Sequence, residues 1–150
     1  MDALDIAILH SLAQNARRKA SAISQEISLS VSAVIERIRK MEDSGIIQGY
    51  TTVLDQKRLG NDISAYMEVC LEHPKYCEGF VAQALALENV LTCHYLTGDF
   101  DFMLYLVAKS SEALEAIHRQ IKGIEGVSST KTHFVLQAVK ENTCLLPKGE

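Results

Sequence analysis

The segment between residues 30 and 43 places small and charged side chains where they could contact a nucleic acid. Val34, Ile38 and Met41 recur at the spacing of one helical face, so the residues between them project outward or sideways. Short side chains at the start of such a helix let its backbone approach DNA, a carboxylate can accept from cytosine, and an arginine can reach guanine or phosphate. We therefore expect DNA contacts from Ser30, Ser32, Ala33, Glu36, Arg37 and Lys40. The alternative is a solvated face whose own charges pair one turn apart.

A second group of charges, Arg17-Arg18-Lys19, precedes the second expected helix. The chain has a net charge of −4, but its first 60 residues carry eight basic and seven acidic side chains, against seven and twelve in the rest. In helix-turn-helix docking, this end of the second helix faces the DNA backbone. Arg17, Arg18 and Lys19 are therefore predicted to contact phosphates, with an ordinary surface loop as the alternative. Two copies of the chain would double contacts that are few in one copy.

The third group is the turn Gly98-Asp99-Phe100-Asp101. Gly98 permits a positive φ angle, and Asp99 or Asp101 could hold an ammonium group. Backbone amides near the turn and near residues 126–127 could bind a carboxylate, so this chemistry would select α-amino acids as a class. The alternative is an ordinary hairpin turn, in which the aspartates only favour the geometry.

Three short helices before residue 45 would position the first two groups. Apolar periodicity predicts them over residues 2–14, 21–28 and 30–43. Ser30 can cap the third helix, and Gly45 suits its left-handed end. Two helices separated by a tight turn indicate a helix-turn-helix, and a strand rich in β-branched residues is expected over 46–54. We place the DNA-binding domain at 1–54 and a hinge or linker at 55–62.

From residue 63 the apolar pattern changes to alternation. The predicted order is strand, helix, strand, strand, helix, strand, over residues 63–71, about 80–87, 90–96, 101–107, about 111–122 and 127–139. This is the split β-α-β unit of ferredoxin-like folds, which we assign to residues 63–150, and the fold class is α+β. Both helices would cover one face of the sheet, and a bare apolar face usually means association.

Other classes of function have little support in the sequence. Cys70, Cys77, Cys93 and Cys144 show no Cys-x-x-Cys spacing, and adjacent Cys93 and His94 would point to opposite faces of a strand, so no metal is expected. No nucleophile-base pair or phosphate loop is visible, so we expect no enzyme and no cofactor. The chain lacks an apolar run long enough for a membrane span, and its acidic start is unlike a signal peptide, so we expect a cytoplasmic protein.

These segments together resemble the Lrp/AsnC (leucine-responsive, feast/famine) family of transcriptional regulators, and the resemblance covers nearly the whole chain. The N-terminal part rests on Leu4-Asp5, Ile8-Leu9, Asn15-Ala16-Arg17, Leu29-Ser30-x-Ser32-Ala33-Val34, Arg37, Met41-Glu42, Gly45-Ile46-Ile47-x-Gly49-Tyr50 and Leu59-Gly60. The C-terminal part rests on Thr97-Gly98-Asp99-Phe100-Asp101, Ile124-Glu125-Gly126-Val127 and Thr132. Phe100 replaces the family's commoner tyrosine, which removes one hydroxyl from the turn.

The resemblance implies a (winged) helix-turn-helix followed by a ferredoxin-like domain of the RAM type, and a sequence-specific regulator of transcription that binds double-stranded DNA. It also implies a homodimer that assembles further, to an octamer, and an amino-acid effector that shifts assembly or DNA affinity. Effectors of the family bind near the Gly-Asp turn at contacts between dimers, which carries over to Gly98, Asp99, Asp101 and Thr132. The family keeps an arginine at the position of Arg37, where bracing against the first helix is a rival role.

Two other functions stay open as alternatives. One is an amino-acid-binding oligomerisation module whose N-terminal helices bind protein. The other is a small enzyme that uses Asp99, Asp101 and a histidine on the ferredoxin-like sheet. DNA binding that depends strongly on salt separates the regulator from the first alternative, and a turnover assay separates it from the second.

Overall fold

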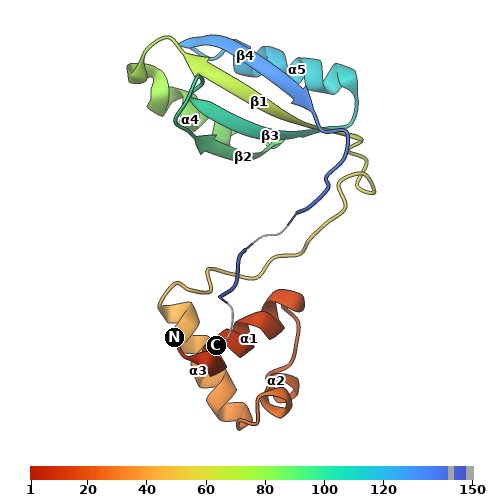
Figure 1. The fold of residues 1–150 in the computed structure, drawn as a ribbon. Coiled ribbons are helices and arrows are strands. Elements are labelled where there is room, and N and C mark those ends of the chain that lie inside the picture. The colour runs from red at the N-terminus through yellow and green to blue at the C-terminus, as the bar shows by residue number, and fades with distance from the viewer. Residues whose placement is uncertain (142–143, 148–150) are drawn as a thin grey trace. The chain divides into compact units, whose positions relative to one another are not determined.

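The chain forms two compact units in the computed structural model, which describes residues 1–141 and 144–147 (Figure 1). The first unit contains Met1–Val53 and the described residues from Lys140 onward, and the second contains Leu54–Val139. Within the first unit, the Nε2 atom of His10 lies 3.0 Å from the carbonyl oxygen of Pro147. The described C-terminal segment therefore groups with the helical unit.

Three helices build the first unit, as the apolar periodicity predicts. They are α1 (Ala3–Gln14), α2 (Ala20–Glu26) and α3 (Val31–Asp43). Their inward faces meet in a small core of fully or nearly fully buried residues: Ile8, Ile23, Val34 and Met41. Partly buried side chains, among them Leu12, Leu29 and Ile38, pack around this core. The helix-turn-helix expected from the sequence is confirmed.

The turn between α2 and α3 is tight because one residue takes the left-handed conformation. Ser28 has φ 55°, and the amide of Leu29 donates to the carbonyl of Ser24 at 3.1 Å. A side chain in this region costs energy that a glycine would not. At the other end of α3, Gly45 has φ 74°, as expected for a residue that ends a helix.

The strand expected over residues 46–54 does not form. Its β-branched residues suit a pleated surface, but a strand also needs a neighbour to accept and donate its ladder hydrogen bonds, and no other strand of the described residues pairs with it. Val53 is 87% exposed. The hydroxyl of Tyr50 donates to Glu42 Oε1 at 2.8 Å, which ties the start of this segment to α3.

The second unit has the predicted order of strands and helices. Its elements are β1 (Ile63–Leu71), the 3₁₀ turn η1 (Pro74–Tyr76), α4 (Cys77–Leu85), β2 (Val90–Tyr95), β3 (Phe102–Ala108), α5 (Ser111–Lys122) and β4 (Val127–Phe134). The strands form an antiparallel sheet in the order β2-β3-β1-β4, which is ferredoxin-like. The last strand ends at Phe134, which pairs with Ala65, and not at Val139 as expected. Its partner β1 begins at Ile63, two residues before Ala65, so residues 137–139 extend beyond β1.

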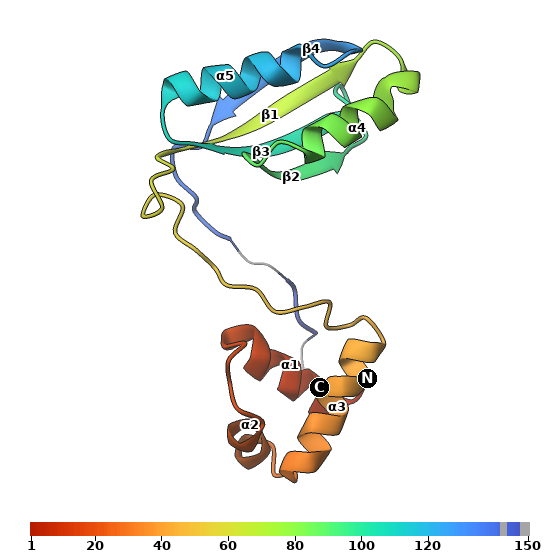
Figure 2. The same ribbon diagram turned by 180° about the vertical axis from the view of Figure 1, so that it is seen from behind.

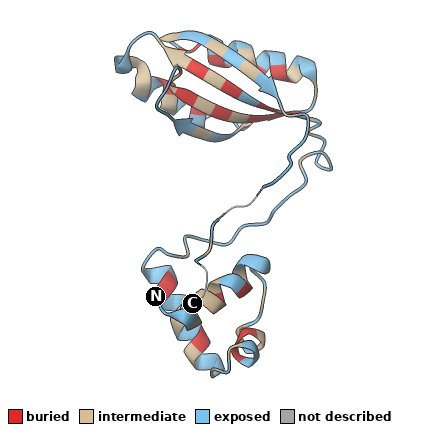
Figure 3. Ribbon diagram, viewed as in Figure 1, coloured by how far each residue is buried: buried red, intermediate tan, exposed pale blue. Residues whose placement is uncertain are grey.

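Both helices of the second unit cover the same face of the sheet (Figure 2). Buried residues alternate along β1 and β3 (Figure 3), and Ala65, Met67 and Val69 lie beneath α4 and α5 with 0% exposure. On the uncovered face, the rings of Tyr66 and Tyr105 lie 5.0 Å apart, and Tyr66 is 45% exposed. The helices leave this face of the sheet uncovered (Figure 2), and Tyr66 is a partly exposed aromatic side chain on it. Among the described residues, no helix is long and apolar enough to cross a membrane.

Candidate nucleic-acid interface and effector turn

Capping at Ser30 fixes the start of α3. Its Oγ accepts from the backbone amide of Ala33 at 3.2 Å and lies 3.1 Å from Oγ of Ser32. Such a cap satisfies an amide that the first turn of a helix leaves without a partner. Ser30 therefore positions the helix, and its availability for a DNA contact is reduced by this role.

The outward face of α3 carries two parallel rows of side chains. We call Ser32, Glu36 and Lys40 the polar row, and Val31, Ile35 and Arg39 the mixed row. All six residues are exposed. In the polar row, Nζ of Lys40 lies 2.8 Å from Oε1 of Glu36, and this hydrogen bond holds the pKa of Glu36 below its usual value. The pair seen here is the one expected for a solvated face, and Lys40 can reach DNA only after leaving Glu36.

Arg37 braces α3 against the start of α1. Its Nη1 donates to Asp2 Oδ2 at 2.7 Å and to Asp5 Oδ1 at 2.6 Å. Asp2 also caps α1 by accepting from the amide of Asp5 at 2.9 Å. The pKa of Asp2 is lowered, first by that amide and then by Arg37, and the two carboxylates raise the pKa of Arg37. The guanidinium charge is therefore already neutralised within the unit, which is the rival role considered for this residue.

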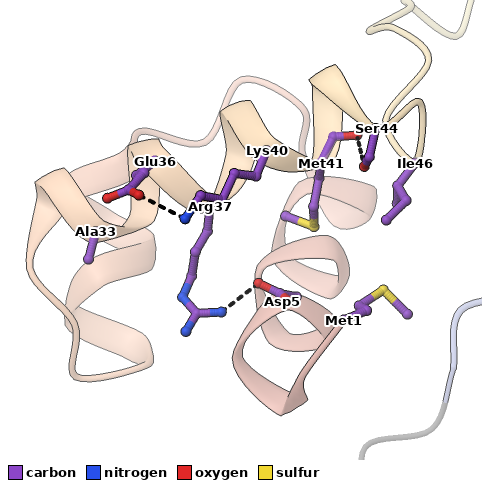
Figure 4. A pocket seen from close by; sticks show the side chains of 9 residues that line it. All are labelled: Met1, Asp5, Ala33, Glu36, Arg37, Lys40, Met41, Ser44 and Ile46. Atoms are coloured by element: carbon purple, nitrogen blue, oxygen red, sulfur yellow. Dashed lines mark hydrogen bonds and ion pairs between the residues drawn. The ribbon is translucent and has the colours of Figure 1, made fainter.

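A pocket of about 570 Å³ lies beside this brace, between α1 and α3 (Figure 4). Its lining residues are Met1, Asp5, Ala33, Glu36, Arg37, Lys40, Met41, Ser44 and Ile46. The acidic and basic side chains in this lining pair with one another, as the dashed lines from Arg37 to Asp5 and from Lys40 to Glu36 show. Because no side-chain charge of this lining is left over, the pocket offers no evident site for a charged ligand.

The basic cluster before α2 is divided by the fold. Arg18 forms an ion pair with Glu26. Arg17 and Lys19 are exposed, and neither forms an ion pair with any residue that the structure describes. Lys19 is the N-cap residue of α2, so both free charges lie at the start of that helix. Of the three residues predicted to contact phosphate, Arg17 and Lys19 can therefore do so without first breaking an ion pair of the described structure.

The turn between β2 and β3 uses one of its aspartates for its own structure. Oδ2 of Asp101 accepts from the amide of Leu71 at 2.7 Å, and the amide of Asp101 donates to Val69 at 2.9 Å, so this residue fastens the turn to β1. Gly98 has φ 130°, a backbone conformation that favours glycine. Asp99 is exposed, and its carboxylate makes no hydrogen bond or ion pair with a described residue.

Thr132, the remaining effector candidate, lies on β4 and pairs with Met67 of β1. Since β1 lies between β3 and β4, the structure does not bring Thr132 beside the Gly98 turn. Its hydroxyl oxygen is nevertheless buried and has no hydrogen-bond partner among the described residues. A buried hydroxyl usually has a partner. Thr132 pairs with Met67, whose side chain lies on the face of the sheet that the helices cover.

The sequence reasoning overlooked the mixed row on α3. Continuing the helical period from Val34, Ile38 and Met41 around the whole helix places Arg39 on the outward side and Arg37 at its edge. Arg39 is exposed and forms no ion pair with any described residue. The helical spacing that placed Arg37 outward or sideways therefore also places Arg39 outward, and Arg39 was left out of the predicted DNA contacts.

A small helix-turn-helix with an exposed face on its third helix, followed by a ferredoxin-like unit, defines a class of DNA-binding regulators. A model of the AsnC-type helix-turn-helix domain matches residues 1–42, and a model of the Lrp/AsnC ligand binding domain matches residues 64–145. The chain belongs to the Lrp/AsnC family and is a DNA-binding transcriptional regulator. The family, fold class and function inferred from the sequence are confirmed.

Named relatives and solved structures match over almost the whole length. The leucine-responsive regulatory protein of Haemophilus influenzae is 32% identical, over 99% of this chain and 91% of its own. AsnC of Escherichia coli superposes with a TM-score of 0.90 at 28% identity, covering 96% of this chain and 97% of that one. A transcriptional regulator of Neisseria meningitidis, solved as a complex with L-methionine, has a TM-score of 0.92 at 28% identity, covering 97% and 96%.

Proposed function

We propose that this regulator binds duplex DNA by placing the N-terminal half of α3 in the major groove. The observation that carries the proposal is the division of α3 into a buried stripe, including Val34 and Met41, and an exposed face that begins with Ser32. Small side chains at this end let the helix backbone approach the bases closely. Arg17 and Lys19, at the start of α2, contact the phosphates beside the groove.

Two copies of the chain act together in this proposal. The first unit has few unpaired basic groups, so a single copy would bind DNA weakly. The uncovered sheet face of the second unit, which includes Tyr66 and Tyr105, supports association into a homodimer. Two-fold symmetry then presents two α3 helices to half-sites about one helical turn of DNA apart. Further assembly of dimers, to an octamer, would multiply these contacts.

An amino acid modulates this activity in our proposal, through Gly98, Asp99, Asp101 and Thr132. Asp99 supports it because its carboxylate is free to hold an ammonium group, whereas Asp101 holds the turn in place. The buried hydroxyl of Thr132 adds a polar atom without a partner among the described residues. The similar regulator of Neisseria meningitidis was solved with L-methionine. An effector of this kind acts by its different affinities for two assembly states.

The DNA proposal is tested by the salt dependence of binding, measured by fluorescence anisotropy on duplexes selected from a random pool. The logarithm of the binding constant falls as the logarithm of the salt concentration rises. Replacing both Arg17 and Lys19 by Ala should make this slope less steep by about 0.9 for each phosphate that the variant no longer neutralises. Arg119→Ala is the matched control, because Arg119 is an exposed basic residue of α5 paired with Glu115 at 3.0 Å. Absence of duplex binding at low salt would instead favour a protein-binding role for the first unit.

The effector proposal is tested by thermal shift and light scattering with a panel of free amino acids. Asp99→Asn should abolish any shift that the wild-type protein shows, since the amide cannot neutralise an ammonium group. Asp62→Asn, at another exposed aspartate of the same unit, should leave the shift intact. A shift that survives in Asp99→Asn would remove this carboxylate from the site.

A further inference from the structure

The mixed row of α3 exposes two branched apolar side chains on the face that we propose for DNA. Val31 is 42% exposed and Ile35 is 54% exposed, and the spacing of four residues places them one helical turn apart on the same side. Arg39 follows one turn later on this side. Ile38, on the same helix, packs against the core of the helical unit, whereas Ile35 stays outside it.

The two rows offer different chemistry to a groove. The polar row holds its charges in an internal pair, with 2.8 Å between Lys40 and Glu36. The mixed row holds an apolar surface next to a cation that has no ion pair among the described residues. In the major groove, the C5-methyl group of thymine is the apolar feature that distinguishes one base from the other three, and aliphatic side chains contact it.

We infer that Ile35 and Val31 are specificity-determining residues that contact thymine methyl groups, while Arg39 anchors the mixed row to the adjacent phosphate. This inference rests on the proposed placement of α3 in the major groove, and it names the base that this face selects. Val31 is the first residue of α3 and Ile35 lies one turn later, so both belong to the N-terminal half of the helix, the part that contacts base edges in helix-turn-helix docking.

The spacing of the mixed row also sets the spacing of the bases. Four residues of an α-helix advance by about 6 Å, and successive base pairs of DNA are about 3.4 Å apart along one strand. Val31 and Ile35 therefore contact thymines about two base pairs apart in each half-site, on either strand. A selected operator should show two such A·T positions, with a two-fold related pair in the other half.

The experiment uses the full-length chain and duplexes enriched from a random pool. Each thymine of the enriched half-site is replaced in turn by deoxyuridine, which removes the methyl group and leaves base pairing unchanged. Removal of one methyl group should weaken binding about fourfold, as expected for burying one CH₂-sized group. We expect this effect at two thymines per half-site and no effect elsewhere.

Ile35→Ala should bind thymine and deoxyuridine duplexes equally at one of these positions, and Val31→Ala should do so at the other. Ile46→Ala is the matched control, because Ile46 is 50% exposed in the same unit but lies outside α3. It should keep the full deoxyuridine effect. Circular dichroism of each variant checks that the helices are retained.

The outcomes separate this inference from the proposal on which it rests. One outcome is an enriched sequence whose affinity stays the same when deoxyuridine replaces any of its thymines. That result overturns the inference and leaves the proposed DNA binding intact. A methyl effect that persists in both Ile35→Ala and Val31→Ala also overturns it, because another side chain must then contact the methyl group. Failure to enrich any duplex overturns both.

Discussion

The two units of this regulator are held together in different ways. In the second unit, thirteen residues are buried between the sheet and its two helices. In the first unit, four of the described residues form the buried core, and ion pairs lie around it, from Arg37 to Asp2 and Asp5 and from Arg18 to Glu26. A small core leaves a larger share of stability to contacts at the surface. The helical unit therefore uses for its own structure some of the charges that DNA binding would also use.

A basic residue on α3 therefore has to be judged by its ion-pair partners before a DNA contact is assigned to it. Arg37 and Arg39 are two residues apart on α3, yet one is held by two carboxylates and the other has no ion pair among the described residues. In a unit with a larger core, the helices would not need such a brace. Substitutions in the two units should therefore differ in their effects on stability.

The largest effect is expected from the core of the first unit. Ile8→Ala removes a fully buried side chain and should lower the free energy of unfolding by about 2–5 kcal/mol. Because only four residues form this core, calorimetry should show the helical unit melting separately, at a lower temperature. Ile121→Ala removes an equally buried side chain from the second unit, and that unit should stay folded at room temperature. Unfolding of both units together in Ile8→Ala would contradict their independence.

Next in size is the contrast between the two arginines. Arg37→Ala removes the brace and should lower the melting temperature of the helical unit, while Arg39→Ala should leave it unchanged. Arg39→Ala should instead weaken DNA binding and reduce its salt dependence by about 0.9 in the log-log slope for each copy that contacts phosphate. Calorimetry measures the melting temperature of both variants, and anisotropy titrations at several salt concentrations measure their DNA affinity. The opposite pattern, with Arg37→Ala stable and Arg39→Ala unstable, would exchange the two roles.

Much of the fold could be predicted from the sequence because it follows from periodicity within single elements. The spacing of Val34, Ile38 and Met41 predicts the inward face of α3, and the alternation from Ile63 predicts β1. The strand over 46–54 was wrong, because β-branched composition does not say whether a partner strand exists. The last strand was also predicted too long, since residues 137–139 extend beyond the start of β1 at Ile63.

The candidate sites were less predictable, because their chemistry depends on partners distant in the sequence. Arg37 meets Asp2 and Asp5 only after α1 and α3 pack, and Asp101 meets the amide of Leu71 only in the folded sheet. No local pattern reveals that one charge is engaged and its neighbour is free. The DNA-binding and effector residues therefore stay predictions, and so do the domain boundaries. Arg39 is the exception, since helical spacing alone would have placed it outward.

A smaller effect is expected at the turn between α2 and α3. Ser28→Gly should raise the free energy of unfolding of the helical unit by about 0.5–1 kcal/mol, because glycine takes the left-handed conformation without a side-chain penalty. Ser44→Gly is the control: Ser44 has right-handed helical angles, so glycine there only adds freedom to the unfolded chain and should be neutral or destabilising. Stabilisation by both substitutions would contradict the role assigned to Ser28.

The smallest effect concerns the charge on the brace and appears only in acid. The pKa of Asp2 is lowered from 3.8 in the folded unit, so its ionised form stabilises the fold at pH values above that ordinary pKa. This stabilisation is lost as the pH falls through the lower folded pKa, while Arg37 stays charged. Asp2→Asn keeps a side-chain oxygen that can cap α1 and removes only the charge.

Melting temperatures of the helical unit, measured between about pH 6 and about pH 2, should therefore be lower for Asp2→Asn than for the wild-type protein near neutrality and should converge at the acid end. If Asp2→Asn runs parallel to the wild type, the charge of Asp2 contributes nothing to stability, and Asp5 is then the carboxylate through which Arg37 braces α3 against α1.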